Sequence, residues 1–509
     1  MRKENLLLLF LLALKFTLPF FLQHPIYELH RDEYLYYEQG QHLDFGFLEN
    51  PPLIGVLAYI SSLLGGGAFW IKFWPALFGA ATLFVTAKMA KELGGGLYAQ
   101  FLAALGILFS AYLRIHYLFQ PNFLDIFFWL LSAYFLVRYI NSGDQRFIFC
   151  VALSLAAGWY SKYSILFFAV ALVLSLLLTA HRKLFATKGF WLAVVAAFAL
   201  VLPNIYWQYV HNWPLLHHMK ELRETQLQNL SKVDFLKEQI LMLFPVAFLW
   251  IGGLIWLLRT NTYRPLAYCY LLIISLLLIS SGKGYYALGA YPMLVAAGGV
   301  WAERSSQKRA WLRYVFVGIV LLLAFPFVPV LLPIQPPVDM AASNKKFGLE
   351  KIGLLKWEDG ESHLLQQDFA DMVGWKEIAE KTEKLFQQQP DTVKSATTIY
   401  CASYGLAASM KYFAKDDYFR DKIVSENGTF LLWAPARLYF KHLVYVDDEM
   451  PEKDDEVLKR FAAMQVVDSC TNIYSRQYNT KIIHLKNASD SAWIIAARDI
   501  RQAKQNFSR

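Results

Sequence analysis

Residues 6–34 read LLLLFLLALKFTLPFFLQHPIYELHRDEY and place the acidic pair Asp32-Glu33 directly after an apolar helix, Leu6 to Leu22. Ionisable groups near a bilayer are costly, so two carboxylates at the mouth of a first membrane span indicate a site. The structural alternative is that the pair caps a helix, because Asp and Glu suit a first helical turn. The stretch predicts chemistry at a membrane face, on a substrate held in lipid.

The composition is that of a membrane protein. The 509 residues are 56% hydrophobic and 16% aromatic, and the mean hydropathy is +0.32, values typical of chains that cross the bilayer many times. The formal charge of +9 lies mostly in short loops between apolar segments, where basic residues set orientation, so no nucleic-acid partner is expected. No small-residue cleavage site follows the first apolar run, so we expect it to remain as an anchor.

Eleven apolar segments predict a polytopic α-helical membrane domain over residues 1–333, since a span needs about 20 apolar residues. The stretch 51–64 is shorter and begins with Pro51-Pro52, which favours an interfacial or re-entrant helix. The predicted spans are 6–22, 69–90, 98–118, 121–140, 146–160, 163–180, 189–209, 238–258, 265–281, 285–301 and 312–333.

The basic residues predict the orientation of these spans. If the N-terminus lies in the cytoplasm, every loop on that side carries at least two basic residues, which is the positive-inside bias. The exception is the basic outer loop 210–237. The first outer loop, 23–68, and the region after residue 333 then share the outer side with Asp125, Lys162 and Lys283.

Residues 334–509 follow a proline-rich linker and predict a soluble extracytoplasmic α/β domain. Cys401 and Cys470 lie in a compartment that permits disulfides, and whether they pair is left open. Strands are predicted at 397–401, 429–433, 442–446 and 481–485, and helices at 371–389, 405–413 and 457–464.

Three acidic positions on the outer side are candidates for chemistry. Asp32 can act as a general base, orient a nucleophile or hold a metal. Glu49 precedes Asn50-Pro51-Pro52, so Asn50 is expected to cap the next helix, and Glu49 has either a site role or a helix-dipole role. Asp125 enters an apolar helix, where a carboxylate needs a partner or a water-lined cavity.

Two lysines flanked by tyrosines, Lys162 and Lys283, end spans on the same side. Cations at this depth suit a phosphate group, but taken alone each lysine fits snorkelling beside an aromatic belt slightly better. Arg114 and His116 in the third predicted span are similar candidates. Lys15 lies inside the first span and is expected to face the bundle interior.

Motifs of soluble nucleotide enzymes do not occur: the sequence contains no P-loop, no Rossmann glycine fingerprint and no His-Glu-x-x-His. This disfavours an ATP-driven machine.

The motifs that do occur resemble, in their order, the polyprenyl-phosphate-dependent glycosyltransferases of the GT-C superfamily, in particular the bacterial branch of the protein O-mannosyltransferase type that includes the lipid A aminoarabinose transferases. The resemblance rests on Asp32-Glu33 with Tyr34, Tyr36 and Tyr37, Glu49-Asn50-Pro51-Pro52, Asp125, Ser161-Lys162, Lys283 with Tyr285, Tyr286 and Tyr291-Pro292, Leu202 to Trp207 with His211-Asn212-Trp213, and the segments 371–375 and 404–408.

The resemblance implies transfer of a sugar from a polyprenyl-phosphate donor, undecaprenyl phosphate in a bacterium, at the outer face of the inner membrane. The acceptor would be lipid A, another glycan or a protein. Asp32 would be the base, or the group that orients the acceptor, with Glu33 and Asp125 in the same acidic site. Lys162, Lys283, Tyr291 and Arg114 would bind the donor phosphate, and Glu49, Tyr286 and His211 would line the site.

Two positions depart from the aminoarabinose transferases, which carry an arginine and a lysine where this chain has Leu35 and Asn50. Arg31 or Arg114 would replace those contacts, and the sugar is left open. Some relatives bind a divalent ion, for which Glu49 with one of the residues His211, His217 or His218 would be the ligands here.

Two other classes of function compete with a transferase. A transporter or flippase predicts repeat symmetry and broken spans at matched positions in two halves, which the sequence does not display clearly. A non-catalytic envelope scaffold needs fewer spans than eleven for anchoring.

Overall fold

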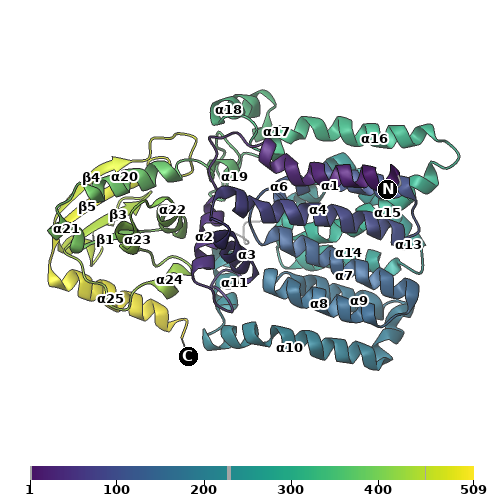
Figure 1. Ribbon diagram of the computed structural model, residues 1–509, viewed down its shortest axis with the longest axis horizontal. Coiled ribbons are helices and arrows are strands. Elements are labelled where there is room, and N and C mark those ends of the chain that lie inside the picture. The colour runs from purple at the N-terminus through teal and green to yellow at the C-terminus, as the bar shows by residue number, and fades with distance from the viewer. Residues whose placement is uncertain (1–2, 226–230, 453, 509) are drawn as a thin grey trace.

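The computed structural model describes residues 3–225, 231–452 and 454–508 and consists of a helical bundle beside a smaller domain built on a sheet (Figure 1). This confirms the predicted class, a polytopic helical protein with a C-terminal α/β domain. The N-terminus lies at the end of the bundle away from the sheet, and α2 (Arg31–Gln41) and α3 (Leu53–Leu63) lie between bundle and sheet.

Each of the eleven predicted spans contains helix. By length and composition, four helices of the described chain could each cross a membrane, and two bent pairs could each form a further span. The count of eleven stays a prediction. The bundle helices are α1 (Lys3–Phe21), α4 (Ala68–Glu92), α5 (Leu97–Leu108), α6 (Tyr112–Ile115), α7 (Asn122–Ser142), α8 (Arg146–Ser161), α9 (Ile165–Leu177), α10 (Lys188–Val210), α11 (Pro214–Thr225), α12 (Lys232–Leu241), α13 (Ala247–Arg259), α14 (Arg264–Ile279), α15 (Tyr291–Ser305), α16 (Trp311–Ala324) and α17 (Val328–Leu331).

Three of the predicted spans are broken. The span expected at 98–118 ends at Leu108 and continues as the single turn α6. The chain bends by 108° between α9 and the 3-10 turn η1 (Ala180–Ala186). It bends by 66° after α12, where Pro245 lies in the 3-10 turn η3 (Phe244–Val246), because proline removes a backbone donor from a helix.

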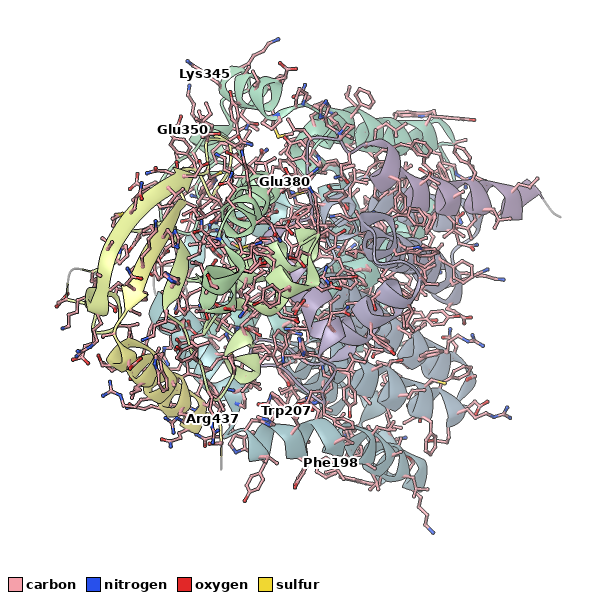
Figure 2. All side chains as sticks on the ribbon, turned by 60° about the vertical axis from the view of Figure 1, so that its left-hand side comes forward. Phe198, Trp207, Lys345, Glu350, Glu380 and Arg437 are labelled. Carbon is pink, nitrogen blue, oxygen red and sulfur yellow. The ribbon has the colours of Figure 1, made fainter. Side chains whose placement is uncertain are left out.

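The outermost helices expose apolar surface of the kind a bilayer covers. On α10, Phe198 is 57% exposed whereas Trp207 is 5% exposed and faces the rest of the chain (Figure 2). Inside the bundle, by contrast, the buried lysine of α1 bonds to the protein. Lys15 is 1% exposed, and its ammonium donates to the Tyr112 carbonyl at 2.9 Å, which confirms that it faces the interior.

The short helix α3 falls within the predicted stretch 51–64, but its expected cap is wrong. The N-cap is Pro52, and no side chain caps this helix. The Asn50 amide is buried and pairs with the Gln39 amide through two hydrogen bonds of 2.9 and 3.0 Å. Asn50 therefore ties the start of α3 to α2.

The sheet has the order β2-β1-β3-β5-β4, with β1 parallel to both of its neighbours and β5 antiparallel to β3 and β4. The strands are β1 (Thr397–Cys401), β2 (Ile423–Val424), β3 (His442–Asp447), β4 (Phe461–Ser469) and β5 (Lys481–Ala488). The helices after the bundle are α18 (Pro337–Lys346), α19 (Gln367–Ala370), α20 (Trp375–Gln387), α21 (Asp391–Ser395), α22 (Tyr404–Phe413), α23 (Asp417–Asp421), α24 (Phe430–Trp433) and α25 (Asp490–Gln505). Two further 3-10 turns lie in the bundle, η4 (Gly284–Ala290) and η5 (Phe325–Phe327), and two lie after it, η6 (Leu349–Ile352) and η7 (Leu458–Arg460).

The strands predicted at 397–401, 442–446 and 481–485 are confirmed, as are helices within 371–389 and 405–413. The strand predicted at 429–433 is wrong: the segment forms the short helix α24 after Gly428, whose φ of +59° turns the chain. The helix predicted at 457–464 is also wrong. The second half of that segment belongs to β4, whose side chains are largely exposed, so pairing with β5 fixes this strand rather than an apolar pattern.

All four cysteines are free thiols, so Cys401 and Cys470 do not pair. Cys401 contacts the sulfur of Met410 at 3.9 Å, and Cys470 lies 3.7 Å from the Glu377 carboxylate.

The acidic pair lies at the start of α2, and Glu33 fastens this helix to the bundle. Glu33 is fully buried, and its carboxylate accepts from the Lys72 ammonium at 2.7 Å and from the Phe119 backbone N–H at 2.6 Å. It also accepts from the His30 backbone N–H at 2.7 Å, while the His30 ring accepts from the Asp32 N–H, a capping box. The geometry favours an anchoring role for Glu33 over the predicted catalytic one, because its carboxylate is shielded from solvent and paired with the buried Lys72.

Glycines allow the backbones of α13 and α15 to meet in the bundle core. A Cβ at Gly298 would overlap the Leu249 carbonyl, and one at Gly253 would overlap the Leu294 carbonyl. Small residues at such crossings are typical of packed membrane helices.

We expect Gly298→Ala to lower the stability by about 1–3 kcal/mol, the usual cost of overpacking a core. Gly318→Ala on α16 is the matched control, since a Cβ there meets nothing within 4 Å. Thermal unfolding in detergent compares the two, and equal melting temperatures would contradict the close crossing.

We expect Lys72→Met to destabilise the protein by about 3–5 kcal/mol, because it leaves the Glu33 carboxylate buried without its partner. The double variant Glu33→Gln with Lys72→Met should recover part of that loss. Denaturation of the two single variants and the double variant measures the coupling, and strictly additive losses would show that no ion pair holds α2.

Candidate active site between the helix bundle and the C-terminal domain

Asp32 lies beside Glu33 but points to a different environment. Its carboxylate is 20% exposed and accepts hydrogen bonds from Arg31 Nε at 3.3 Å, Gln120 Nε2 at 3.1 Å and the Tyr404 hydroxyl at 2.8 Å. Burial alone would raise the pKa of Asp32, but the Arg31 guanidinium, His30 and the Tyr404 hydroxyl together hold that pKa below its ordinary value. Asp32 is therefore an ionised, partly exposed carboxylate held by side chains from three segments of the chain.

Asp125 opens α7 and is enclosed. Its two oxygens accept from Trp129 Nε1 and from the Ser164 hydroxyl, both at 2.7 Å. It interacts electrostatically with Lys162, the C-cap residue directly after α8. Asp125 therefore has the partner that a carboxylate in an apolar helix requires, and it balances the charge of Lys162 at this end of the bundle.

Lys162 is held in a fixed position over aromatic rings. Its ammonium donates to Asn122 Oδ1 at 2.7 Å and lies 4.7 Å from the ring centre of Tyr286 and 5.3 Å from that of Tyr285. Rings in this position stabilise a cation without neutralising it. The sequence predicted both Lys162 and Tyr286 here, and the structure brings them into contact.

Lys283 meets a carboxylate that the sequence did not suggest. Its ammonium lies 3.3 Å from Glu358 Oε1, and Glu358 also lies 3.5 Å from Arg476. Burial would raise the pKa of Glu358, but Lys283 and Arg31 keep it below its ordinary value. Glu358 thus links the Lys283 cation to the neighbourhood of Asp32.

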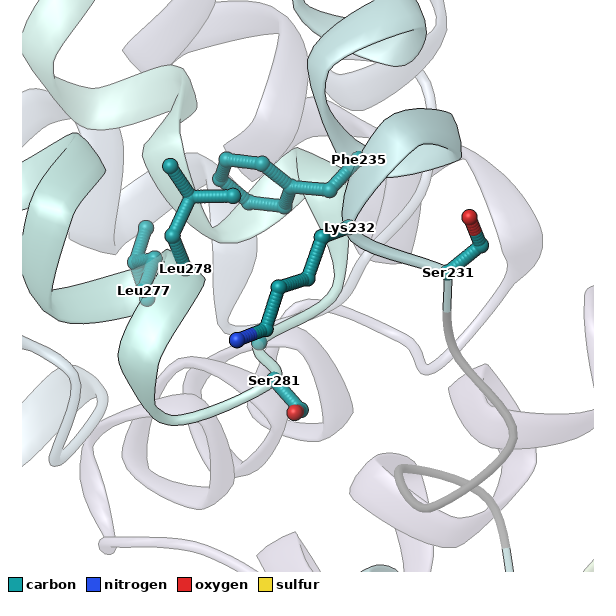
Figure 3. A pocket seen from close by; sticks show the side chains of 7 residues that line it. Ser231, Lys232, Phe235, Leu277, Leu278 and Ser281 are labelled. Atoms are coloured by element: carbon teal, nitrogen blue, oxygen red, sulfur yellow. The ribbon is translucent and has the colours of Figure 1, made fainter.

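A small surface pocket borders the turn that carries Lys283 (Figure 3). In Figure 3 the Lys232 side chain extends from the start of α12 toward Ser281. Its lining residues are Ser231, Lys232, Phe235, Leu277, Leu278, Ser281 and Gly282.

Two of the predicted phosphate ligands are engaged elsewhere. Arg114 donates to the Val330 carbonyl at 3.0 Å and pairs with Asp368 at 3.3 Å. Tyr291 is fully buried, and its hydroxyl donates to Gln239 Oε1 at 2.9 Å inside the bundle. The structure therefore does not bring either side chain to Lys162.

Glu49 binds the C-terminal domain. Its carboxylate accepts from the backbone N–H of Thr429 at 2.6 Å and from the hydroxyl of the same residue. Burial raises the pKa of Glu49, an effect that the two hydrogen bonds from Thr429 oppose. The sequence left a site role and a helix-dipole role open for Glu49, and the structure adds a link across the domain boundary that the sequence did not predict.

The three candidate histidines have other contacts. The His211 ring stacks on Trp207 with centres 4.1 Å apart, and His217 packs against the ring of Phe507. His218 interacts electrostatically with Glu221. Over the part of the chain that the structure describes, no group of three or more His, Cys, Asp or Glu side chains could hold a metal ion. The pairing of Glu49 with one of these histidines stays a prediction.

Sequence reasoning missed the partners that lie far away in the chain. Lys72 lies inside an apolar helix, which is itself a signal for a buried partner. Gln120, Glu358 and Tyr404 carry no such local signal.

Comparisons with known proteins match this architecture. Residues 49–207 match the family model of dolichyl-phosphate-mannose-protein mannosyltransferases. The chain is 25% identical over 230 residues to the lipid A galacturonosyltransferase RgtD of Rhizobium johnstonii. The aligned region covers 43% of this chain and 47% of that protein. The chain thus spans about half the length of this curated relative.

Two solved structures share the fold. ArnT from Cupriavidus metallidurans bound to undecaprenyl phosphate superposes with a TM-score of 0.64 at 15% identity, covering 95% of this chain and 98% of that one. The oligosaccharyltransferase AglB from Archaeoglobus fulgidus, in complex with an inhibitory peptide and a dolichol-phosphate, gives a TM-score of 0.50 at 11% identity over 87% and 69% of the two chains.

The family match covers the segment from Glu49 through Asp125 and Lys162 to Trp207, and the fold agrees over nearly the whole chain. These findings confirm the predicted resemblance, and the chain has the fold of the glycosyltransferases of the GT-C superfamily.

Proposed function

We propose that the chain is a membrane glycosyltransferase that moves a sugar from a polyprenyl-phosphate donor to an envelope acceptor at the outer face of the bacterial inner membrane. One observation carries the proposal: Asp32, an ionised and accessible carboxylate, lies at the same end of the bundle as the lysines Lys162 and Lys283. The basic loops at the opposite end support the orientation.

The donor phosphate would bind between Lys162 and Lys283. The Lys162 ammonium lies over the rings of Tyr285 and Tyr286. Lys283 directly precedes η4, the turn that carries these two tyrosines. In the structure the Lys283 ammonium forms an ion pair with the Glu358 carboxylate, so the donor phosphate would take the place of this carboxylate. The undecaprenyl phosphate bound to ArnT supports a polyprenyl carrier.

The proposed reaction uses the negative charge of Asp32 and the positive charges of Lys162 and Lys283. Asp32 takes the proton of the acceptor hydroxyl or amine as that group forms a bond to the anomeric carbon of the sugar. The bond between that carbon and the phosphate oxygen breaks, and the polyprenyl phosphate leaves with the electron pair. Lys162 and Lys283 stabilise the charge that develops on the leaving phosphate.

Lipid A is the acceptor that the curated relative supports, since that relative is a lipid A galacturonosyltransferase. Another glycan or a protein is the alternative. A transporter or flippase is not favoured, because the relatives are transferases.

We expect Asp32→Asn to lower kcat by about a hundredfold or more, the contribution usual for a general base. Turnover of purified protein with polyprenyl-phosphate sugar and lipid A, followed by mass spectrometry, measures it. Asp44→Asn is the control, since Asp44 is an exposed carboxylate of the same loop that bonds only its neighbour Phe45 among the described residues. Full turnover by a folded Asp32→Asn variant would overturn the proposed function.

We expect Lys162→Met to raise the KM for the donor about tenfold or more, because a charge-assisted contact to phosphate is lost. The KM for the acceptor should change little. Lys345→Met is the control, since Lys345 projects from α18 at the surface (Figure 2). An unchanged donor KM would exclude Lys162 from the phosphate site.

A further inference from the structure

The C-terminal domain supplies one of the three side chains that hold Asp32. The Tyr404 hydroxyl donates to Asp32 Oδ1 at 2.8 Å, the shortest of the side-chain hydrogen bonds that the described residues make to this carboxylate. Tyr404 and Asp32 are 372 positions apart in the chain. The contact therefore exists only when the C-terminal domain is docked on the bundle.

Hydrogen bonds at the start of α22 fix the position of Tyr404. It is the first residue of α22, directly after β1, and the Ser403 side chain caps this helix by accepting from the Leu406 N–H at 3.3 Å. The Tyr404 backbone N–H donates to Asn427 Oδ1 at 3.1 Å. The start of α22 is thus fixed from two directions before the hydroxyl meets Asp32.

The glycine after Tyr404 lets α22 come close to α2. A Cβ at Gly405 would lie 2.6 Å from Arg31 Cγ and 3.0 Å from the Trp375 ring. Further along, Tyr412 packs on Tyr34 with ring centres 5.3 Å apart. Residues 404–405 and 31–32 are therefore a complementary contact between the two domains.

We infer that Tyr404 is a positioning residue for the proposed reaction: it orients the Asp32 carboxylate toward the acceptor, so that the site is complete only with the C-terminal domain in place. The inference rests on the proposed function. Tyr404 donates a hydrogen bond and keeps its proton throughout, while the acceptor proton passes to Asp32.

The electrostatics agree with this role. Burial and the Asp32 charge raise the pKa of Tyr404 well above its ordinary value, so the hydroxyl stays a donor. The groups that act on Asp32 are His30 and Arg31 from its own segment, Tyr36 from the next turn of α2, neutral Gln120 from the bundle and Tyr404 from the C-terminal domain. Of these, only Tyr404 joins Asp32 to the C-terminal domain.

Tyr404→Phe removes the hydroxyl and keeps the ring. Since this hydrogen bond favours the ionised form of Asp32, its loss raises the pKa of Asp32, and activity is lost as the pH falls through that pKa. We expect the acidic limb of the kcat profile to move upward by about one pH unit and kcat at neutral pH to fall about tenfold to a hundredfold, with the donor KM unchanged.

Tyr412→Phe is the matched control, because Tyr412 lies on the same helix α22 and packs on α2 against Tyr34 and Tyr37, away from Asp32. It should keep the parent pH profile. If Tyr404→Phe also keeps the parent profile while Asp32→Asn is inactive, the inference fails and the proposed function stands. If Asp32→Asn is active, the proposed function itself fails.

Discussion

The buried ion pair between Glu33 and Lys72 is the constraint on which the site depends. A carboxylate and an ammonium removed from solvent are retained only with close partners, and Glu33 has the Lys72 ammonium at 2.7 Å together with two backbone donors. The pair fixes the first turn of α2 against α4 and the segment before α7. Asp32, the residue before Glu33 in the same turn, is thereby directed toward the C-terminal domain.

Three of the links from the C-terminal domain reach α2 and the segment that follows it. Tyr404 binds Asp32, Thr429 binds Glu49, and Lys411 pairs with Glu38 at 2.9 Å. All three partners lie in the first loop, between α1 and α4, so this loop is the layer that joins bundle and domain (Figure 1). A domain docked in this way contributes directly to the chemistry that we propose, beyond covering the site.

The sequence predicted the bundle because apolar length is a local property, and it predicted Asp32, Lys162 and Lys283 at one end because loop charge reports sidedness. It could not distinguish Asp32 from Glu33, since that depends on Lys72, 39 positions away. Arg114 and Tyr291 were misplaced for the same reason: their partners Asp368 and Gln239 are distant in the chain. In the C-terminal domain, β4 has exposed side chains, so its pairing with β5 and not its pattern makes it a strand.

The central claim is that acids and amines from distant segments form one site for a lipid-linked phosphate. A cryo-electron microscopy structure of the protein with undecaprenyl phosphate tests it most directly. The account predicts phosphate density within hydrogen-bond distance of both Lys162 and Lys283, with Glu358 moved away and Asp32 facing the same space. Phosphate bound at another part of the bundle, with Glu358 still on Lys283, would contradict it.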